Sequence, residues 1–250
     1  MNKFVCSQSI RFFSANTLGR DFVVGDIHGC FDVLDTILQR VNFDFRVDRV
    51  FSVGDLVDRG AYSERVLDWL DKPWFHAVRG NHEQMAIEGL RGVGDIPRHI
   101  RNGGAWLYEL PDAIQTKIVD ALDALPLMIE VELSASRVVG IVHAEAPILA
   151  KGDGWNEAKE SIKYIAEKGR REITLQHALY SRVKIESQDF SPIAGVDRLF
   201  VGHSTVPDIK VLGNVVYMDT GCSFDDGALS ILELNTGVVT TEFMTGYVEF

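Results

Sequence analysis

Cysteine is scarce in this 250-residue sequence. Its three cysteines, Cys6, Cys30 and Cys222, are odd in number, and no two of them have the spacing of a CxxC motif. This pattern excludes a disulfide framework and a zinc ribbon, and we expect free thiols in a reducing compartment. Cys30 directly follows a glycine-bounded polar cluster. A small buried residue at a helix start explains it better than a redox role.

Long apolar runs are also missing. No stretch of the chain approaches the roughly 18 apolar residues that a membrane span requires. The N-terminus lacks the ordered basic, apolar and small-residue regions of a signal peptide. We therefore expect a cytoplasmic protein without a membrane partner. The absence of long coiled-coil heptads favours a monomer.

Positive charge is under-represented. The sequence has 25 Lys and Arg against 36 Asp and Glu, a net charge of −11. This balance argues against nucleic acid or an anionic membrane as the main partner. A phosphate-binding function remains open, because bound metals and a few arginines can make one pocket positive within an acidic protein.

Three polar clusters dominate the first third of the chain. They are Gly25–Gly29, Gly54–Gly60 and Gly80–Glu83, and each follows a short apolar run that is typical of a β-strand. Segments with helical periodicity, Phe31–Val41 and Ser63–Leu70, lie between them. The repeat of strand, polar turn and helix predicts a parallel sheet with crossover helices. Because ligands of such sheets lie beyond the carboxyl ends of the strands, we expect the clusters to converge.

The rest of the chain predicts a β-rich second half. An amphipathic helix is expected at Pro111–Leu125 and an exposed, charge-patterned helix at Trp155–Lys168. The predicted strands are Leu127–Leu133, Val138–Val142, Arg198–Val201, a strand at Val211, Val215–Met218, Ala228–Leu234 and Val238–Phe243.

Three segments have weaker patterns. Residues 1–20 are expected to be an extended lead-in or a small hairpin, residues 91–110 to be loop-rich with short helical pieces at most, and residues 169–195 have no assigned element. No linker, internal repeat or low-complexity tract divides the chain. We expect one α/β domain over residues 1–250.

The polar clusters contain groups that bind metals. The candidate ligands are Asp26, His28, Asp55, Asn81, His143 and His203, the last two at the ends of later predicted strands. Such a nitrogen and oxygen set with one shareable carboxylate, for which Asp55 is the natural bridge, suits two metals such as Mn²⁺, Fe or Zn²⁺. Two metals about 3.5–4 Å apart can lower the pKa of a shared water and stabilise an in-line displacement at phosphorus.

Single histidines carry little information by themselves, since a lone histidine is more often a core or surface residue than a ligand. Polar clusters that each end a predicted strand are hard to explain as coincidence. The other histidines, His76, His99 and His177, have no such context, and we expect them to be structural or solvated.

The three clusters resemble the GDxHG, GDxVDRG and GNHE signatures of the PPP-type metallophosphatases. Within that group the chain is most similar to the bacterial and phage serine/threonine protein phosphatases of the lambda type. Shorter matches support this at Asn102–Trp106, His143-Ala144 and Gly202–Ser204. The resemblance covers about residues 20–220. It implies a calcineurin-like metallophosphatase sandwich, with mixed β-sheets in the middle and helices outside.

The resemblance also implies a role for each matched residue. Asp26, His28 and Asp55 correspond to the ligands of one metal, and Asp55, Asn81, His143 and His203 to those of the other. His82 corresponds to the general acid and Asp58 to the carboxylate that orients it. A neighbouring carboxylate suits an acid, because it raises the pKa of an imidazole and fixes its tautomer.

Three arginines match phosphate-binding positions of the family. Arg59 resembles a phosphate-binding arginine, Arg79 has a supporting part, and Arg182 matches a more distant phosphate clamp. The planar guanidinium can hold two phosphate oxygens at once. For Arg79 an ordinary salt bridge is an equal alternative. Glu83 is expected to be a structural partner rather than a metal ligand.

These observations predict a dimetal-dependent phosphatase that acts on phosphoserine and phosphothreonine in proteins, with phosphotyrosine as a further substrate. Water activated between the metals would attack phosphorus in line, and no covalent phosphoenzyme is needed. The alternative is a diadenosine tetraphosphate hydrolase, a family that usually departs from Asp at the position of Asp58 and from Glu at that of Glu83. A non-catalytic scaffold domain is disfavoured because every expected catalytic position is filled.

Overall fold

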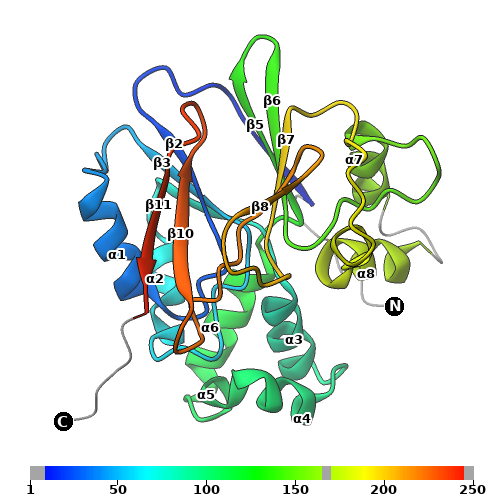
Figure 1. Ribbon diagram of the computed structural model, residues 1–250. Coiled ribbons are helices and arrows are strands. Elements are labelled where there is room, and N and C mark those ends of the chain that lie inside the picture. Colours follow the sequence, from blue (N-terminus) through cyan, green and yellow to red (C-terminus); the bar gives the residue numbers. More distant parts are fainter. Residues whose placement is uncertain (1–8, 165–169, 245–250) are drawn as a thin grey trace.

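Two mixed β-sheets form the middle of the computed structural model, which describes residues 9–164 and 170–244. Figure 1 shows the sheets side by side, with helices α1 and α2 on the outer side of one sheet and α7 and α8 on the outer side of the other. This arrangement of two central sheets flanked by helices confirms the fold class predicted from the sequence.

The first sheet contains the strands that precede the three polar clusters. Its order is β11-β10-β2-β3-β4. The three strands predicted before the polar clusters, β2 (Asp21–Val24), β3 (Arg49–Ser52) and β4 (Phe75–Ala77), are parallel, and β4 is an edge strand. At one edge β10 (Ala228–Glu233) and β11 (Val239–Phe243) add to the sheet in antiparallel order. The carboxyl ends of the parallel strands therefore lie at one edge of the fold.

The second sheet has six strands in the order β1-β5-β6-β7-β9-β8. Its core is the hairpin of β5 and β6, followed by the parallel neighbours β7 and β9. The strand bounds are β1 (Ile10–Phe13), β5 (Met128–Ser134), β6 (Arg137–Val142), β7 (Arg198–Val201), β8 (Lys210–Leu212) and β9 (Val215–Tyr217).

The helices form from amphipathic stretches that bury one face. Helix α1 (Phe31–Arg40) shows this plainly, because Phe31, Leu34 and Leu38 are buried while its other face carries charged residues. The other helical elements are η1 (Ser63–Arg65), α2 (Val66–Leu70), α3 (Asn81–Leu90), α4 (Ile96–His99), η2 (Ile100–Gly104), α5 (Ala105–Tyr108), α6 (Asp112–Asp123), α7 (Trp155–Lys163), α8 (Arg171–Tyr180) and α9 (Val183–Glu186).

Apolar side chains fill each interface between layers. Between the sheets, Phe51 of β3 and Phe200 of β7 belong to one cluster of fully buried residues. A second cluster lies between the first sheet and its helices, and a third, around Trp155, lies under α7 and α8. The two sheets are thus held face to face by their inner side chains, which fixes the distance between their carboxyl ends.

Three segments with weak patterns in the sequence have defined elements. The described part of the lead-in is extended, the first of its two expected alternatives, because β1 pairs with β5 in parallel and not in a hairpin. Residues 96–108 hold the short helical pieces that the prediction allowed, but these follow one another without a loop between them and break at Gly103, whose φ is 98°. Helices α8 and α9 lie in the stretch without an assigned element. In each case tertiary packing organises a segment with weak local signals.

Two expectations reach beyond the described residues. The helix expected at Trp155–Lys168 is α7 up to Lys163, and its predicted end lies outside the described ranges, as does Cys6. Cys30 caps the N-terminus of α1 and is buried, as expected. Among the helices that the structure describes, none has both the length and the apolar character of a bilayer span.

The inter-sheet core predicts a clear stability difference between two phenylalanines. Replacing Phe200, which is fully buried between the sheets, by Ala should lower the free energy of unfolding by about 3–5 kcal/mol, because a cavity replaces the ring. Phe12 of β1 is 58% exposed, and Phe12→Ala should cost less than about 1 kcal/mol. Urea unfolding measures both; equal losses would contradict the assignment of the core.

Candidate active site

The polar clusters meet at the ends of strands from both sheets. Residues from the ends of β2, β3 and β7 and from the start of α3 line one pocket of about 310 Å³. Its lining residues are Asp26, His28, Asp55, Arg59, Asn81, His82, Arg98, Asn102, Tyr180, Arg182, His203, Thr205, Asp219 and Phe224. Fully buried His143, at the end of β6, contacts this group through Asn81. The convergence expected from the sequence is therefore present in the structure.

The backbone is strained at this site. Five non-glycine residues have positive φ angles here: His28 (44°), Asp55 (48°), Asp58 (72°), Arg59 (69°) and His203 (62°). L-residues adopt this region only when the surrounding structure compensates for the cost. The turns direct four of these side chains into the pocket, whereas Asp58 is fully buried beside His82.

Glu83 stabilises the strained backbone of the second polar cluster through hydrogen bonds. Its carboxylate accepts hydrogen bonds from the backbone amides of Asp55 (2.9 Å), Leu56 (2.8 Å) and Gly80 (2.7 Å). The side chain is fully buried, and burial together with the charge of Asp55 raises the pKa of Glu83 to about 7. Glu83 ties the loop after β3 to the start of α3, so it is a structural partner, as expected.

Each of two histidines has one ring nitrogen that faces a backbone carbonyl and one that faces Asn81. His143 directs Nδ1 at the carbonyl of Val53 (2.8 Å), and His203 directs Nε2 at the carbonyl of Tyr180 (3.2 Å). A carbonyl can only accept, so these nitrogens carry the protons. The opposite nitrogens of both rings face Oδ1 of Asn81, at 2.9 Å and 2.8 Å.

Burial reinforces this arrangement of lone pairs. It lowers the pKa of His143 and lowers that of His203 to about 3, so both rings are neutral. Lone pairs of two imidazoles and an amide oxygen then converge with no proton between them. This donor set fits a bound divalent cation, and the carbonyl partners orient the rings as they do for metal-binding histidines.

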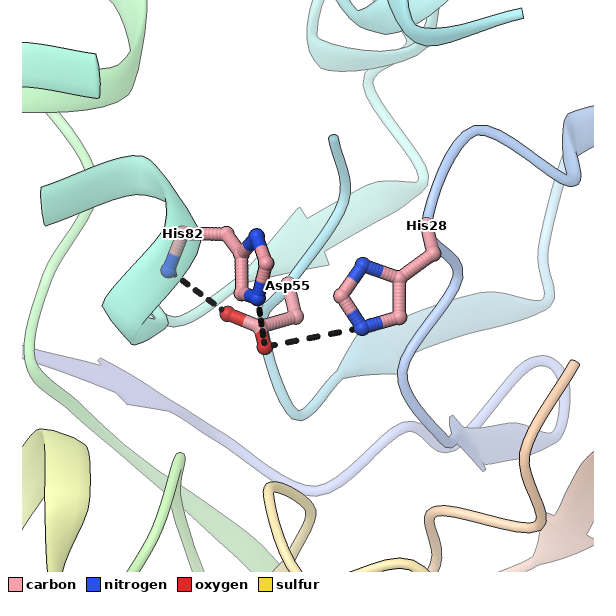
Figure 2. A group of neighbouring side chains, drawn as sticks. All are labelled: His28, Asp55 and His82. Carbon is pink, nitrogen blue, oxygen red and sulfur yellow. Dashed lines mark hydrogen bonds and ion pairs between the residues drawn. The ribbon is translucent and has the colours of Figure 1, made fainter. Parts of the chain in front are cut away.

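Asp55 joins this group to a second one. Its Oδ1 lies 3.4 Å from Nε2 of His143, and its Oδ2 lies 3.7 Å from Nε2 of His28 and 3.8 Å from Nε2 of His82. Figure 2 shows that the rings of His28 and His82 each point a nitrogen at the same oxygen of the Asp55 carboxylate. Two sets of closely spaced candidate ligands result, His28, Asp55 and His82, and Asp55, His143 and His203. Both contain Asp55, which fits its expected place between two metals.

The first set differs in one member from the ligands that the family resemblance implies. Asp26 lines the pocket, and its two carboxylate oxygens accept the backbone amide of His203 at 3.3 Å and 3.1 Å. The carboxylate also packs against Gly202, where any Cβ would lie 1.9 Å from Oδ1. Asp26 thus joins the ends of β2 and β7, and His82 lies closer than Asp26 to the group formed by His28 and Asp55.

His82 is held by a buried carboxylate. Its Nδ1 lies 2.7 Å from Oδ2 of Asp58, and its backbone amide donates to Asp55 Oδ1 at 3.0 Å. Burial acts to lower the pKa of His82, but the charges of Asp55 and Asp58 outweigh it and raise that pKa above the ordinary value. The structure therefore places a protonatable imidazole, with a fixed tautomer, at the floor of the pocket.

Two of the three predicted arginines reach the pocket. The guanidinium of Arg59 lies 3.0 Å from Nε2 of His28 and 3.2 Å from Nε2 of His82. Arg182 lines the pocket and donates to the carbonyl of His203 at 3.0 Å. Both arginines line the pocket, and a guanidinium group can bind two oxygens of one anion at once.

Arg79 lies elsewhere. Its buried guanidinium pairs with the carboxylate of Asp123 at 2.9 Å and donates to Gln84 at 3.1 Å, and Arg79 is outside the set of described residues that line the pocket. Of the two interpretations of Arg79, the ordinary salt bridge is the one that the structure contains. It joins the start of α3 to the end of α6.

The sequence analysis did not identify His99 as a partner of Asp58. His99 was expected to be structural or solvated, yet its Nε2 lies 2.9 Å from Asp58 Oδ2. Trp106, part of a matched motif, donates to the other oxygen of Asp58 at 2.8 Å. His99 has no motif of its own. Its position one helical turn before Asn102 was the one available signal.

Comparisons with known proteins agree with this geometry. The model of the calcineurin-like phosphoesterase family matches residues 22–207. The chain belongs to this family. Its relatives include serine/threonine-protein phosphatase 2 of Escherichia coli, 33% identical over 216 residues that cover 85% of this chain and 92% of the relative.

Two further similarities differ in extent. A symmetrical bis(5'-nucleosyl)-tetraphosphatase of Actinobacillus pleuropneumoniae is 40% identical, but over 77 residues that cover 30% of this chain and 28% of the relative. A solved structure of a protein serine/threonine phosphatase from Saccharomyces cerevisiae has a TM-score of 0.60, 14% identity, and covers 97% of this chain and 85% of its own. The latter supports the fold alone. As a calcineurin-like phosphoesterase, this protein is an enzyme that hydrolyses phosphate esters.

The role of Glu83 in this phosphoesterase can be tested by stability. Glu83→Gln places an amide NH₂ among three backbone N–H donors, so we expect a loss of about 1–3 kcal/mol in the free energy of unfolding. The carboxylate of Glu88, on the same helix, accepts a hydrogen bond from the side chain of Gln84 at 2.8 Å, and Glu88→Gln should cost about 0.5 kcal/mol. Urea unfolding of both proteins in the presence of a chelator measures this difference. Equal losses would contradict the structural role.

Proposed function

We propose that this protein is a cytoplasmic, monomeric, dimetal-dependent protein serine/threonine phosphatase, with phosphotyrosine among its candidate substrates. The observation that carries this proposal is a single pocket in which the His82–Asp58 pair adjoins two candidate metal groups that share Asp55. Arg59 and Arg182 line the same pocket. An acid, a metal centre and a phosphate-binding pair are the parts that hydrolysis of a phosphate monoester needs.

The donor set supports two divalent metals, with Mn²⁺ as our proposal and Fe or Zn²⁺ as alternatives. Imidazole nitrogens and carboxylate or amide oxygens suit these ions. When bound, the two metals would supply positive charge for the phosphate oxygens and lower the pKa of water near phosphorus. Asp26, His28 and Asp55 would hold one metal, and Asp55, Asn81, His143 and His203 the other.

The remaining steps belong to residues of the chain. Arg59 and Arg182 hold the phosphate oxygens and offset the charge that develops during the displacement. His82 then donates its proton to the departing alkoxide oxygen, while Asp58 keeps the ring in the required tautomer and orientation. Arg79 has a structural part in this scheme, through its ion pair with Asp123.

The cysteines have no part in this scheme. Cys222 donates its thiol to the carbonyls of Asp26 (3.0 Å) and Ile27 (3.1 Å), and both Cys30 and Cys222 are buried. They pack beneath the first polar cluster. A covalent phosphocysteine is therefore not part of the proposal.

Phosphoproteins are the proposed substrates because the similarity to a protein phosphatase extends over most of the chain. Hydrolases of dinucleoside polyphosphates match less of it: one relative is 40% identical over 30% of the chain and another is 29% identical over 67%, against 33% identity over 85% for the protein phosphatase. Asp58 and Glu83 also follow the protein phosphatase pattern implied by the resemblance. The shared metal machinery makes diadenosine tetraphosphate the necessary comparison substrate.

Activity of the metal-stripped protein, with Mn²⁺ added back, tests this proposal. The substrates are a phosphoserine peptide, a phosphotyrosine peptide and diadenosine tetraphosphate, and His82→Asn is assayed beside the unchanged protein. We expect Mn²⁺-dependent phosphate release from the phosphoserine peptide and a loss of about 10²–10⁴-fold in the variant, the usual contribution of general acid catalysis.

The other outcomes identify the alternatives. Nucleotide products from diadenosine tetraphosphate with little release from either peptide would replace the proposal by a dinucleoside polyphosphate hydrolase. Bound metal without turnover of any substrate would support a scaffold domain.

A further inference from the structure

The carboxylate of Asp58 has more partners than an orienting group for one histidine needs. Oδ2 lies 2.7 Å from Nδ1 of His82 and 2.9 Å from Nε2 of His99, and Oδ1 accepts from the indole of Trp106 at 2.8 Å. The side chain is fully buried. Two histidines therefore share one carboxylate oxygen.

His99 is itself fixed on every side. It is fully buried, and its Nδ1 lies 2.8 Å from the hydroxyl of Tyr108. The hydroxyl can donate to Nδ1, which leaves Nε2 as the N–H donor to Asp58. Gly104 packs on the ring so closely that any Cβ there would lie 2.2 Å from His99 Nε2.

The chain geometry around His99 supports this packing. His99 ends α4, and the helical path then breaks at Gly103, whose φ of 98° turns the chain so that Trp106 reaches Asp58 from another side. The carbonyl of Gly103 also accepts the backbone amide of Arg59 at 3.4 Å. The segment 96–108 thus contacts both Asp58, which orients His82, and Arg59, which lines the pocket.

These contacts limit the rotation of the Asp58 carboxylate. With His82 alone as its partner, the carboxylate could turn about its Cβ–Cγ bond and let the imidazole tilt. Donors from His99 and Trp106 leave one orientation in which all three hydrogen bonds persist. Because proton transfer depends on placement within a fraction of an ångström, a small tilt of His82 would slow the step in which it donates.

We propose that His99 is a positioning residue for the reaction: through the hydrogen bond to Asp58 it sets the orientation of His82, and Tyr108 sets that of His99. The chain of contacts runs from Tyr108 through His99 and Asp58 to His82. This inference rests on the proposed role of His82 as the general acid. Among the described residues, His99 is outside the set that lines the pocket and outside both candidate metal groups.

The test compares substrates with good and poor leaving groups. A serine alkoxide needs a proton as it departs, whereas p-nitrophenolate leaves readily without one. His99→Leu keeps the ring's approximate volume but removes the donor. We expect it to lower kcat for a phosphoserine peptide about tenfold or more while it changes kcat for p-nitrophenyl phosphate less than about threefold. His99→Gln, whose side-chain NH₂ can reach Asp58, should recover most of the peptide activity.

Two comparisons make the result specific. His76 is a largely buried histidine whose ring packs on that of Phe13, with centroids 4.4 Å apart, and His76→Leu should leave both kcat values unchanged. Tyr108→Phe removes the partner of His99 without a change in the carboxylate's own donors. It should reproduce the leaving-group pattern with a smaller effect, and it keeps the test decisive if His99→Leu folds poorly.

Each result supports or overturns the proposal. Equal losses on both substrates in His99→Leu and Tyr108→Phe, or no loss on either, would overturn the positioning role and leave His99 with packing alone. His82→Asn serves as the reference in the same assay. If His82→Asn shows the leaving-group pattern and the His99 variants do not, this inference alone fails. If His82→Asn lacks the leaving-group pattern, His82 is not the general acid, and the positioning role of His99 is rejected as well.

Discussion

Asp55 stands between the two halves of the site because both groups of candidate ligands contain its carboxylate. One oxygen faces His143 and the other faces His28 and His82, while the amide of His82 holds the carboxylate from the side. A buried negative charge is costly unless positive charge lies nearby. The rest of the site follows from this constraint: strained turns bring the ligands close, and Glu83 holds those turns in place.

The two sheets give this arrangement its precision. His143 follows β6 and His203 follows β7, whereas Asp55 follows β3 of the other sheet, so the ligand groups depend on how the sheets pack. The inter-sheet core around Phe51 and Phe200 fixes that packing. Stability and chemistry are connected at this point, because a shift between the sheets would separate Asp55 from its histidines.

Much of the fold and of the site could be predicted from the sequence, because the patterns that encode them lie within short stretches of the chain. The strand–turn–helix repeats and the polar residues at strand ends are encoded by neighbouring residues, so the parallel strands and the convergence of Asp26, Asp55 and His203 follow from pattern. The segment 96–108 was harder. Its glycines suggested loops, and the helical path becomes favourable when His99 and Trp106 reach Asp58, contacts that span more than 40 positions. Arg79 shows the same limit, since its partner Asp123 lies on another helix.

The most direct test of this account is anomalous diffraction at the manganese edge from crystals grown with Mn²⁺. The account predicts two peaks about 3.5–4 Å apart, with the Asp55 carboxylate within bonding distance of both. One peak should adjoin His28 and the other His143 and His203. A single peak, or two peaks that Asp55 does not bridge, would contradict the central place given to this carboxylate.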